Sequence, residues 1–141
     1  MKVRAAMALV AMVAPALLGL AGREGSPGQQ KGTEEVSYAK HVAPIIKKYC
    51  LPCHAEEAFN PSELALDSYA LLKKGGEHGS PVVPGKPQES MLLQKLEADP
   101  PFGDRMPLQS RRDKKAGIVK KLTQEEEETL RVWITQGAKD N

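Results

Sequence analysis

The sequence predicts a small all-α domain in which three to four helices are joined by long loops. Apolar side chains recur at helical spacing near both ends of the folded region, between residues 37 and 50 and between residues 123 and 137. Glycine and proline residues interrupt much of the chain between these segments. Only 4% of the 141 residues are aromatic, so few large side chains are available to build a core from protein alone.

The first helix is predicted to run from Ser37, which can cap its N-terminus, toward Cys50. The positions that share one face of this helix are apolar: Val42, Ile45, Ile46 and Tyr49. Pro44 lies within this run and has no backbone N–H to donate. We therefore expect the helix to kink or to restart at Pro44.

The middle of the chain is predicted to be mostly loop. Between residues 55 and 85 only Ser68 to Lys74 has the pattern of a short helix, because glycines and prolines punctuate the rest. A further helix is expected to begin at Pro87 and to end before Pro100. Residues 102–121 are predicted to be irregular and are rich in lysine and arginine.

The last helix has the clearest signals at both ends. Thr123 and Glu126 have the spacing of a capping box, residues 125–128 are four glutamates that suit the positive end of the helix dipole, and Gly137 can close the helix. The predicted buried stripe of this helix consists of Leu130, Trp133 and Ile134.

The N-terminus has the pattern of an export signal. Lys2 and Arg4 precede an uncharged, mostly apolar stretch from Ala5 to Leu20, and small residues at 19–21 predict cleavage after Ala21. An uncleaved membrane anchor is the alternative, but the apolar run is shorter than the roughly 20 residues that span a bilayer. We therefore expect a signal peptide at 1–21, a flexible segment at 22–35 and one domain at 36–141, with no stable membrane span in the mature chain.

The charge balance does not favour nucleic acid or a membrane surface as a partner. The chain has 20 lysine and arginine residues against 18 acidic residues, a formal net charge of +2. Charge is uneven locally, however, because seven basic residues follow Phe102 before the four glutamates begin. If that cluster rims a redox site, it would attract an acidic partner; the alternative is a solvated loop.

The two cysteines of the chain lie in the sequence Cys50-Leu51-Pro52-Cys53-His54. Cys-x-x-Cys-His is the attachment motif of heme c: the two cysteines form thioethers with the heme vinyl groups, and the adjacent imidazole binds the iron. A disulfide, half of a zinc site and a thioredoxin-like redox motif are the alternatives. A zinc site would need two further ligands, and a thioredoxin-like motif would need strands alternating with helices. The motif thus predicts one covalently attached heme, around which the helices and loops wrap.

A second axial ligand is needed in an electron carrier, and Met106 is the best candidate. Met1, Met7 and Met12 lie in the predicted signal peptide, which leaves Met91 and Met106. Met91 lies among leucines on a predicted helix and is expected to be a core side chain. Met106 lies in a loop beside Pro107, where an isolated apolar side chain is explained by a metal. The other candidates are His41 and His78.

Several further motifs resemble the planctomycete-type cytochrome c domain family, within the class I cytochrome c fold. The resemblance extends from Tyr38 to Ala138. Besides the heme motif, it rests on Tyr38-x-x-x-Val42-x-Pro44-Ile45-Ile46, Leu64-x-Leu66-Asp67-Ser68, residues 75–79, Pro84-Gly85-x-Pro87-x-x-Ser90, Arg105-Met106-Pro107 and Trp133-Ile134-x-x-Gly137-Ala138. It implies that the first and last helices cross, and that His54 and Met106 bind opposite faces of the heme.

The expected function is one-electron transfer by an exported, mono-heme c-type cytochrome, in the periplasm or elsewhere outside the cytoplasm. The expected partners are redox proteins, and no catalytic residue is predicted. A heme peroxidase is disfavoured because it needs an open iron position and usually a second heme, whereas the sequence contains one heme motif. The alternatives are a heme-based ligand sensor and the heme subunit of a larger extracytoplasmic enzyme complex.

Overall fold

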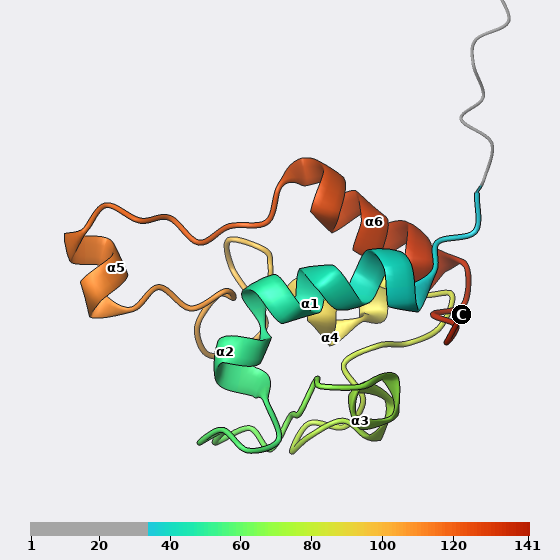
Figure 1. Cartoon of the computed structure of the whole chain (residues 1–141), viewed down its shortest axis with the longest axis horizontal. Coiled ribbons are helices and arrows are strands. Elements are labelled where there is room, and N and C mark those ends of the chain that lie inside the picture. The colour runs from blue at the N-terminus through green and yellow to red at the C-terminus, as the bar shows by residue number, and fades with distance from the viewer. Residues whose placement is uncertain (1–33) are drawn as a thin grey trace, which may run out of the picture. The chain divides into compact units, whose positions relative to one another are not determined.

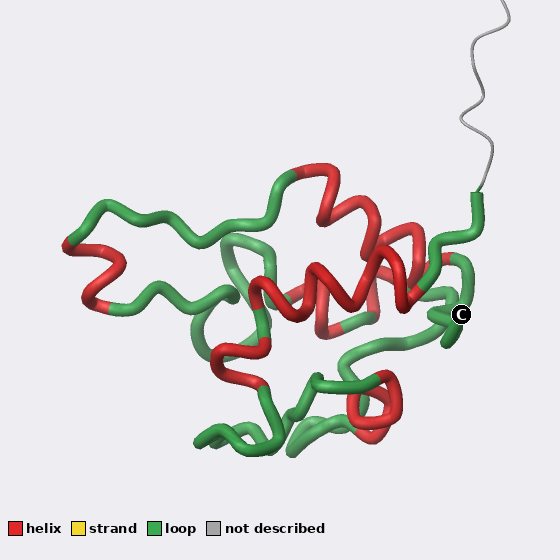
Figure 2. Tube along the Cα trace, in the orientation of Figure 1, coloured by secondary structure: helices red, strands yellow, loops and turns green. Residues whose placement is uncertain are grey.

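The structure, a computed structural model that describes residues 34–141, is helical in this part of the chain (Figure 1). Its elements are η1 (Tyr38–Val42), α1 (Ala43–Tyr49), α2 (Leu51–His54), α3 (Tyr69–Lys74), η2 (Pro87–Glu89), α4 (Met91–Gln94), α5 (Arg111–Lys115) and α6 (Gln124–Thr135). Between residues 34 and 141 there is no strand, apart from an isolated bridge between Gly76 and Gly79 (Figure 2). The predicted signal peptide and most of the segment at 22–35 lie outside the described residues.

The all-α prediction is confirmed, but the structure has more helices than the three to four that were predicted. The described residues contain six short α-helices, one 3-10 turn and one π-helical turn. No helix among them is long and apolar enough to cross a membrane.

The first helical segment begins as predicted and changes register before Pro44. The Ser37 side chain accepts a hydrogen bond from the Lys40 backbone N–H, which caps a π-helical turn, η1. The α-helix α1 then begins at Ala43, with Pro44 in its first turn, a position where proline is tolerated. The restart expected at Pro44 is therefore confirmed.

Helix α6 packs against η1 and closes the core (Figure 1). Its capping box is present, because the Thr123 hydroxyl accepts from the Glu126 N–H and the Glu126 carboxylate accepts from the Thr123 N–H. Three of its residues are almost fully buried, as the predicted stripe requires: Leu130, Trp133 and Ile134. Gly137, with a φ of 101°, ends the helix in a conformation that favours glycine.

An aromatic cluster forms the centre of the contact between the two ends of the domain. The Tyr38 ring lies 5.6 Å from Trp133 and meets Tyr69 edge to face at 5.2 Å. The Tyr69 hydroxyl donates to the Ala138 carbonyl at 2.8 Å, and the Trp133 indole N–H donates to the Lys139 carbonyl at 2.9 Å. The polar ends of two large rings are thus satisfied while their apolar faces are buried.

One of the two helices predicted in the middle of the chain forms as expected, and the other is shorter than predicted. Helix α3 forms at the expected place, with the Ser68 hydroxyl as its N-cap. The helix expected from Pro87 instead breaks at Ser90, whose backbone is extended. The Ser90 hydroxyl is fully buried and bonds the Val83 N–H at 2.9 Å and the Lys86 carbonyl at 2.9 Å. Ser90 therefore anchors the preceding loop instead of continuing a helix.

Helix α5 was missed by the prediction that residues 102–121 are irregular. The Ser110 hydroxyl accepts from the Asp113 N–H, and the Asp113 carboxylate accepts from the Ser110 N–H, which makes a second capping box. This helix has no apolar residue, so hydrophobic periodicity could not reveal it. Its signal was the cap alone.

Candidate heme-binding site

The cysteines and the histidine of the heme motif lie on one helical turn. Cys50 ends α1 and begins α2, and its carbonyl accepts backbone hydrogen bonds from Cys53 at 3.0 Å and His54 at 2.8 Å. Residues three and four positions apart lie on the same side of a helix, so both thiols and the imidazole are presented together. Both cysteines are free thiols, so the structure contains no disulfide between Cys50 and Cys53.

The two thiols differ in their surroundings. Cys50 packs against the hydrophobic core, whereas Cys53 is exposed. Burial, with a smaller contribution from the neighbouring Cys53, raises the pKa of Cys50 to about 11. Reactive redox cysteines and zinc-binding cysteines require a lowered pKa, because the thiolate is the reacting species. A thioether carries no ionisable group, so the burial of Cys50 suits heme attachment better than either alternative.

The His54 ring is oriented by a backbone carbonyl. Its Nδ1 lies 3.1 Å from the Leu64 carbonyl oxygen, which can only accept a hydrogen bond. The proton is therefore on Nδ1, and Nε2 keeps a free lone pair for a metal. This is the tautomer that an axial imidazole needs.

The segment that supplies this carbonyl is held in place from both sides. The Leu64 carbonyl also accepts from the Asn60 side-chain amide, and the Leu66 N–H donates to the His54 carbonyl at 2.8 Å. Behind it, the Glu77 N–H donates to the Ser62 carbonyl at 2.9 Å. A Cβ at Gly76 would collide with the backbone of this segment, which explains why glycine occurs there.

Met106 is held at the end of α4. Its N–H donates to the Lys95 carbonyl at 2.7 Å, and the neighbouring Arg105 Nε donates to the Leu96 carbonyl at 2.6 Å. The Met106 side chain is half-buried and lines a pocket of about 370 Å³. Apolar Pro107, Ile118 and Val119 line this pocket together with basic side chains.

The structure brings Cys50, Cys53 and His54 together, but it does not join them with Met106 in one pocket. The residues that line the Met106 pocket all lie between 105 and 121. A second depression, of about 270 Å³, lies beside the motif and is lined by residues between Ala55 and Gly75. Met106 as the second axial ligand accordingly stays a prediction.

The other candidate ligands each have another contact. His41 is exposed, and its Nδ1 accepts from the Ser37 N–H at 3.0 Å. The His78 ring lies 4.4 Å from the Phe102 ring. Met91 is half-buried and is not among the fully buried core residues, so the expectation of a core side chain holds only in part. Within residues 34–141 no cluster of three or more His, Cys, Asp and Glu side chains is arranged to hold a metal ion.

Two contributors to this site could not be found by sequence reasoning. The carbonyls of Leu64 and Lys95 hold His54 and Met106 respectively, and both are backbone groups. Every residue has the same backbone carbonyl, whatever its side chain. The sequence therefore carries no signal for which carbonyl accepts the hydrogen bond.

The donor set fits heme c. One helical turn offers two free thiols, and the adjacent imidazole has its second nitrogen satisfied. Two thiols and an imidazole with a free ring nitrogen are the groups that heme c needs from the protein.

Residues 50–107 match the sequence model of the family described as Planctomycete cytochrome C. The match begins at the first cysteine of the heme motif and ends at Pro107, directly after Met106. Neither the curated proteins nor the solved structures include a significant match. The matched segment is shorter than the resemblance between Tyr38 and Ala138 and covers less than half of the chain. Over residues 50–107, the chain is thus confirmed as similar to the planctomycete cytochrome C family, which indicates a heme-binding electron carrier.

Proposed function

We propose that this protein is an exported c-type cytochrome that holds one heme and transfers one electron at a time between redox proteins outside the cytoplasm. The observation that carries the proposal is the Cys50–His54 turn, with its free thiols and its imidazole held by the Leu64 carbonyl, inside the segment that matches a cytochrome family. A heme bound there would supply a reversible Fe(III)/Fe(II) couple.

In this proposal each residue of the site has a separate task. Cys50 and Cys53 fix the porphyrin to the end of α1 as thioethers, so the cofactor cannot dissociate during a redox cycle. His54 would hold the heme iron through Nε2, while its Nδ1–H donates to the Leu64 carbonyl and keeps the ring from rotating. Met106 would be the second iron ligand, and a thioether there would raise the reduction potential relative to a second imidazole.

This assignment favours an electron carrier over an enzyme, because two protein ligands leave no iron position open for a substrate. The ligand-sensor alternative is favoured by one observation: Met106 lines a pocket separate from the Cys-x-x-Cys-His turn. A weakly held Met106 could be displaced by a small gas. In an extracytoplasmic complex, the same site would serve as the heme subunit of a larger enzyme.

The test is to produce the full chain in a host that exports and matures c-type cytochromes. We expect a heme stain that persists after denaturing electrophoresis, a mass increase of a single heme and removal of residues 1–21. Redox titration should follow a one-electron curve. Carbon monoxide should leave the spectrum of the reduced protein unchanged; a large spectral change would favour the sensor, and absence of covalent heme would refute the proposal.

A further inference from the structure

Residues 108–121, here called the basic arm, form an organised element and not a loose insertion. The Asp113 carboxylate accepts hydrogen bonds from the Ser110 hydroxyl at 2.6 Å and from the Ser110 N–H at 3.2 Å, and it pairs with the Lys120 ammonium at 2.9 Å. Gln109 joins the same two sides of the arm, because its amide donates to the Lys120 carbonyl and accepts from the Lys120 N–H. These contacts hold the stretch before α5 against the stretch after it.

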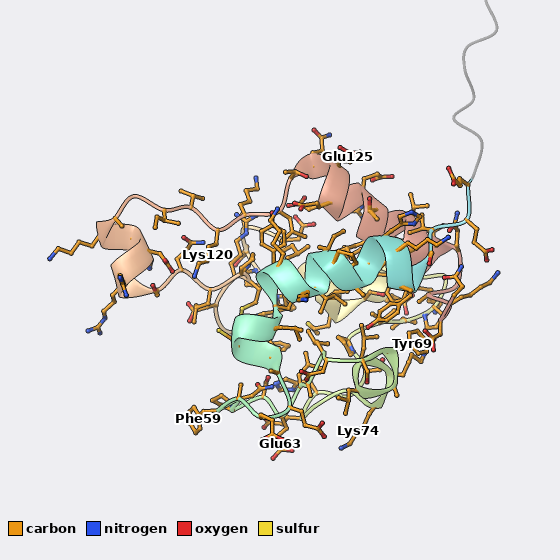
Figure 3. The ribbon with its side chains drawn as sticks, in the orientation of Figure 1. Phe59, Glu63, Tyr69, Lys74, Lys120 and Glu125 are labelled. Carbon is orange, nitrogen blue, oxygen red and sulfur yellow. The ribbon has the colours of Figure 1, made fainter. Side chains whose placement is uncertain are left out.

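The outer surface of the basic arm is strongly positive. Asp113 is its one acidic residue, and Asp113 is 9% exposed and engaged within the arm. Its six basic residues are all exposed: Arg111, Arg112, Lys114, Lys115, Lys120 and Lys121. Helix α5 packs closely against none of the other described helices and stands apart from them in Figure 1, while Figure 3 shows Lys120 on the same side of the domain.

Aliphatic side chains are exposed among these charges. Leu108 is 49% exposed, Ile118 51% and Val119 79%, although burying such side chains elsewhere would be favourable. Ile118 and Val119 also line the pocket that contains Met106, together with Lys114, Lys120 and Lys121. The arm therefore combines an apolar centre, a basic rim and direct contact with the surroundings of the proposed axial ligand.

We propose that the basic arm is the docking surface for an acidic redox protein, which places its electron-transfer site beside Met106. This inference rests on the proposed function, because a partner gains from docking there only if electrons leave near Met106. Ile118 and Val119 would meet apolar side chains of the partner, and the surrounding cations would pair with its carboxylates. An apolar centre with a charged rim is the usual composition of a transient protein interface.

The residues of the arm favour a protein over an anionic membrane as its binding partner. Helices that lie on membranes need an apolar face, whereas α5 has the sequence Arg-Arg-Asp-Lys-Lys. The arm also lacks tryptophan and phenylalanine, and its one leucine, Leu108, lies outside α5. A second copy of the chain is a less suitable occupant because the chain as a whole is nearly balanced in charge. The test below also detects binding to an anionic membrane and dimer formation.

The test uses the mature holoprotein and a reduced acidic flavodoxin as the probe. The arm variant changes Arg111, Arg112, Lys114 and Lys115 to Gln, and the control variant makes the same change at exposed Lys40, Lys47, Lys74 and Lys86, which lie outside the arm. Stopped-flow rates are measured over a range of ionic strength. We expect the arm variant to react about ten-fold more slowly at low salt with a flatter salt dependence, since steering by charge is lost. The control variant should keep most of the wild-type rate and slope.

Zero-length coupling of lysine amines to carboxylates reports docking without electron transfer. We expect cross-links from the flavodoxin to Lys114, Lys115, Lys120 or Lys121, and few to Lys40 or Lys74. Cross-links at the arm without electron transfer would support docking and count against the proposed function. Equal salt slopes in both variants, cross-links confined to other lysines, salt-dependent dimers, or binding to phosphatidylglycerol vesicles in preference to the flavodoxin would each overturn the docking proposal.

The apolar centre has its own variant. Ile118→Ser with Val119→Ser should raise the dissociation constant of the flavodoxin complex several-fold, because apolar contact is lost. The dependence of the reaction rate on ionic strength should be unchanged, because no charge is removed. A reduction potential equal to that of the wild type would show that the heme site is intact in this variant. A double variant that binds the flavodoxin as tightly as the wild type would contradict an apolar centre in the interface.

Discussion

The Tyr49 hydroxyl donates a 2.8 Å hydrogen bond to the Glu126 carboxylate, and this bond ties the residue before Cys50 to the first turn of α6. The same carboxylate accepts from the Thr123 N–H at 2.8 Å and pairs with the Lys48 ammonium at 3.0 Å. Partial burial by itself raises the pKa of Glu126, but these hydrogen bonds outweigh the burial and lower the pKa to about 2. The carboxylate therefore stays charged and joins α1 to α6 beside the heme motif.

Replacing this carboxylate should destabilise the holoprotein in a pH-dependent way. We expect Glu126→Ala to lower the free energy of unfolding by about 1–2 kcal/mol at pH 7, the usual effect of losing a helix cap and its hydrogen bonds. The folded-state pKa of about 2 lies below the ordinary value of 4.5, so this stabilisation is present above pH 4.5 and is lost as the pH falls toward 2. Urea titrations followed by Trp133 fluorescence would measure both effects.

Glu125→Ala is the matched control for this prediction. Glu125 lies in the same first turn of α6 and feels the same helix dipole, but its side chain is exposed. We expect the change at Glu125 to cost less than about 0.5 kcal/mol. Equal losses for the two variants, or a Glu126→Ala effect that does not shrink at low pH, would contradict the role given to Glu126.

Heme attachment and folding should be lost together when both cysteines are removed. The described helices are short, and isolated helices of this length are unstable in water without packing partners. We therefore expect Cys50→Ala with Cys53→Ala to lack covalent heme and to be digested rapidly by protease. Circular dichroism of the purified variant would measure its helix content, and a well-folded, heme-free variant would show this dependence to be wrong.

The single variants separate the two cysteines. Cys53 is exposed and Cys50 packs on the core, so Cys53→Ala should fold with one remaining thioether, whereas Cys50→Ala should also leave a small cavity. We expect the lower thermal midpoint for Cys50→Ala. Denaturing electrophoresis with heme staining would report whether one thioether persists in each case.

The elements that the sequence predicted well are those whose own residues determine them. Ser37 and Thr123 cap helices where expected, because an N-cap is a contact between residues three apart. The buried face of α6 followed from spacing alone, since its apolar stripe has no competing use. Cys50, Cys53 and His54 share one turn for the same local reason.

The features that were missed depend on contacts between distant parts of the chain or on hydrogen bonds without an apolar pattern. Ser90 ends a predicted helix because its hydroxyl bonds a loop that precedes it, and the sequence gives no sign of that partner. The partner of His54 is a backbone carbonyl ten residues away. Helix α5 depends on a cap and on the pairing of Asp113 with Lys120, so periodicity could not predict it.

Removing the sulfur of Met106 should lower the reduction potential and open the iron to added ligands. Met106→Ala leaves the backbone bond to Lys95 in place but removes the proposed axial thioether. We expect the reduced variant to bind carbon monoxide, whereas Met91→Leu should keep the wild-type spectrum and cost less than about 1.5 kcal/mol of stability. Redox titration and carbon monoxide difference spectra would measure both variants. The assignment would be reversed if Met91→Leu opened the site and Met106→Ala did not.

Phe102 should affect how firmly Met106 is held without touching the site of heme attachment. The Phe102 ring lies 4.4 Å from the His78 ring and 4.7 Å from the Lys95 ammonium, which also donates to the Phe102 carbonyl at 2.5 Å. The Lys95 carbonyl in turn accepts from the Met106 N–H. The ring therefore helps to fix the loop that ends at Met106.

Phe102→Ala removes both ring contacts and keeps the backbone ones, so Met106 should be easier to displace. A cation–π contact at an exposed site contributes about 0.5–1 kcal/mol, which corresponds to roughly two- to five-fold tighter binding of added imidazole by the oxidised variant. The other phenylalanine, Phe59, gives the matched control because it is 95% exposed and projects from the edge of the domain (Figure 3). Phe59→Ala should bind imidazole like the wild type. Covalent heme should be present in both variants, and imidazole affinities that rise equally, or do not rise for Phe102→Ala, would show that the ring does not constrain Met106.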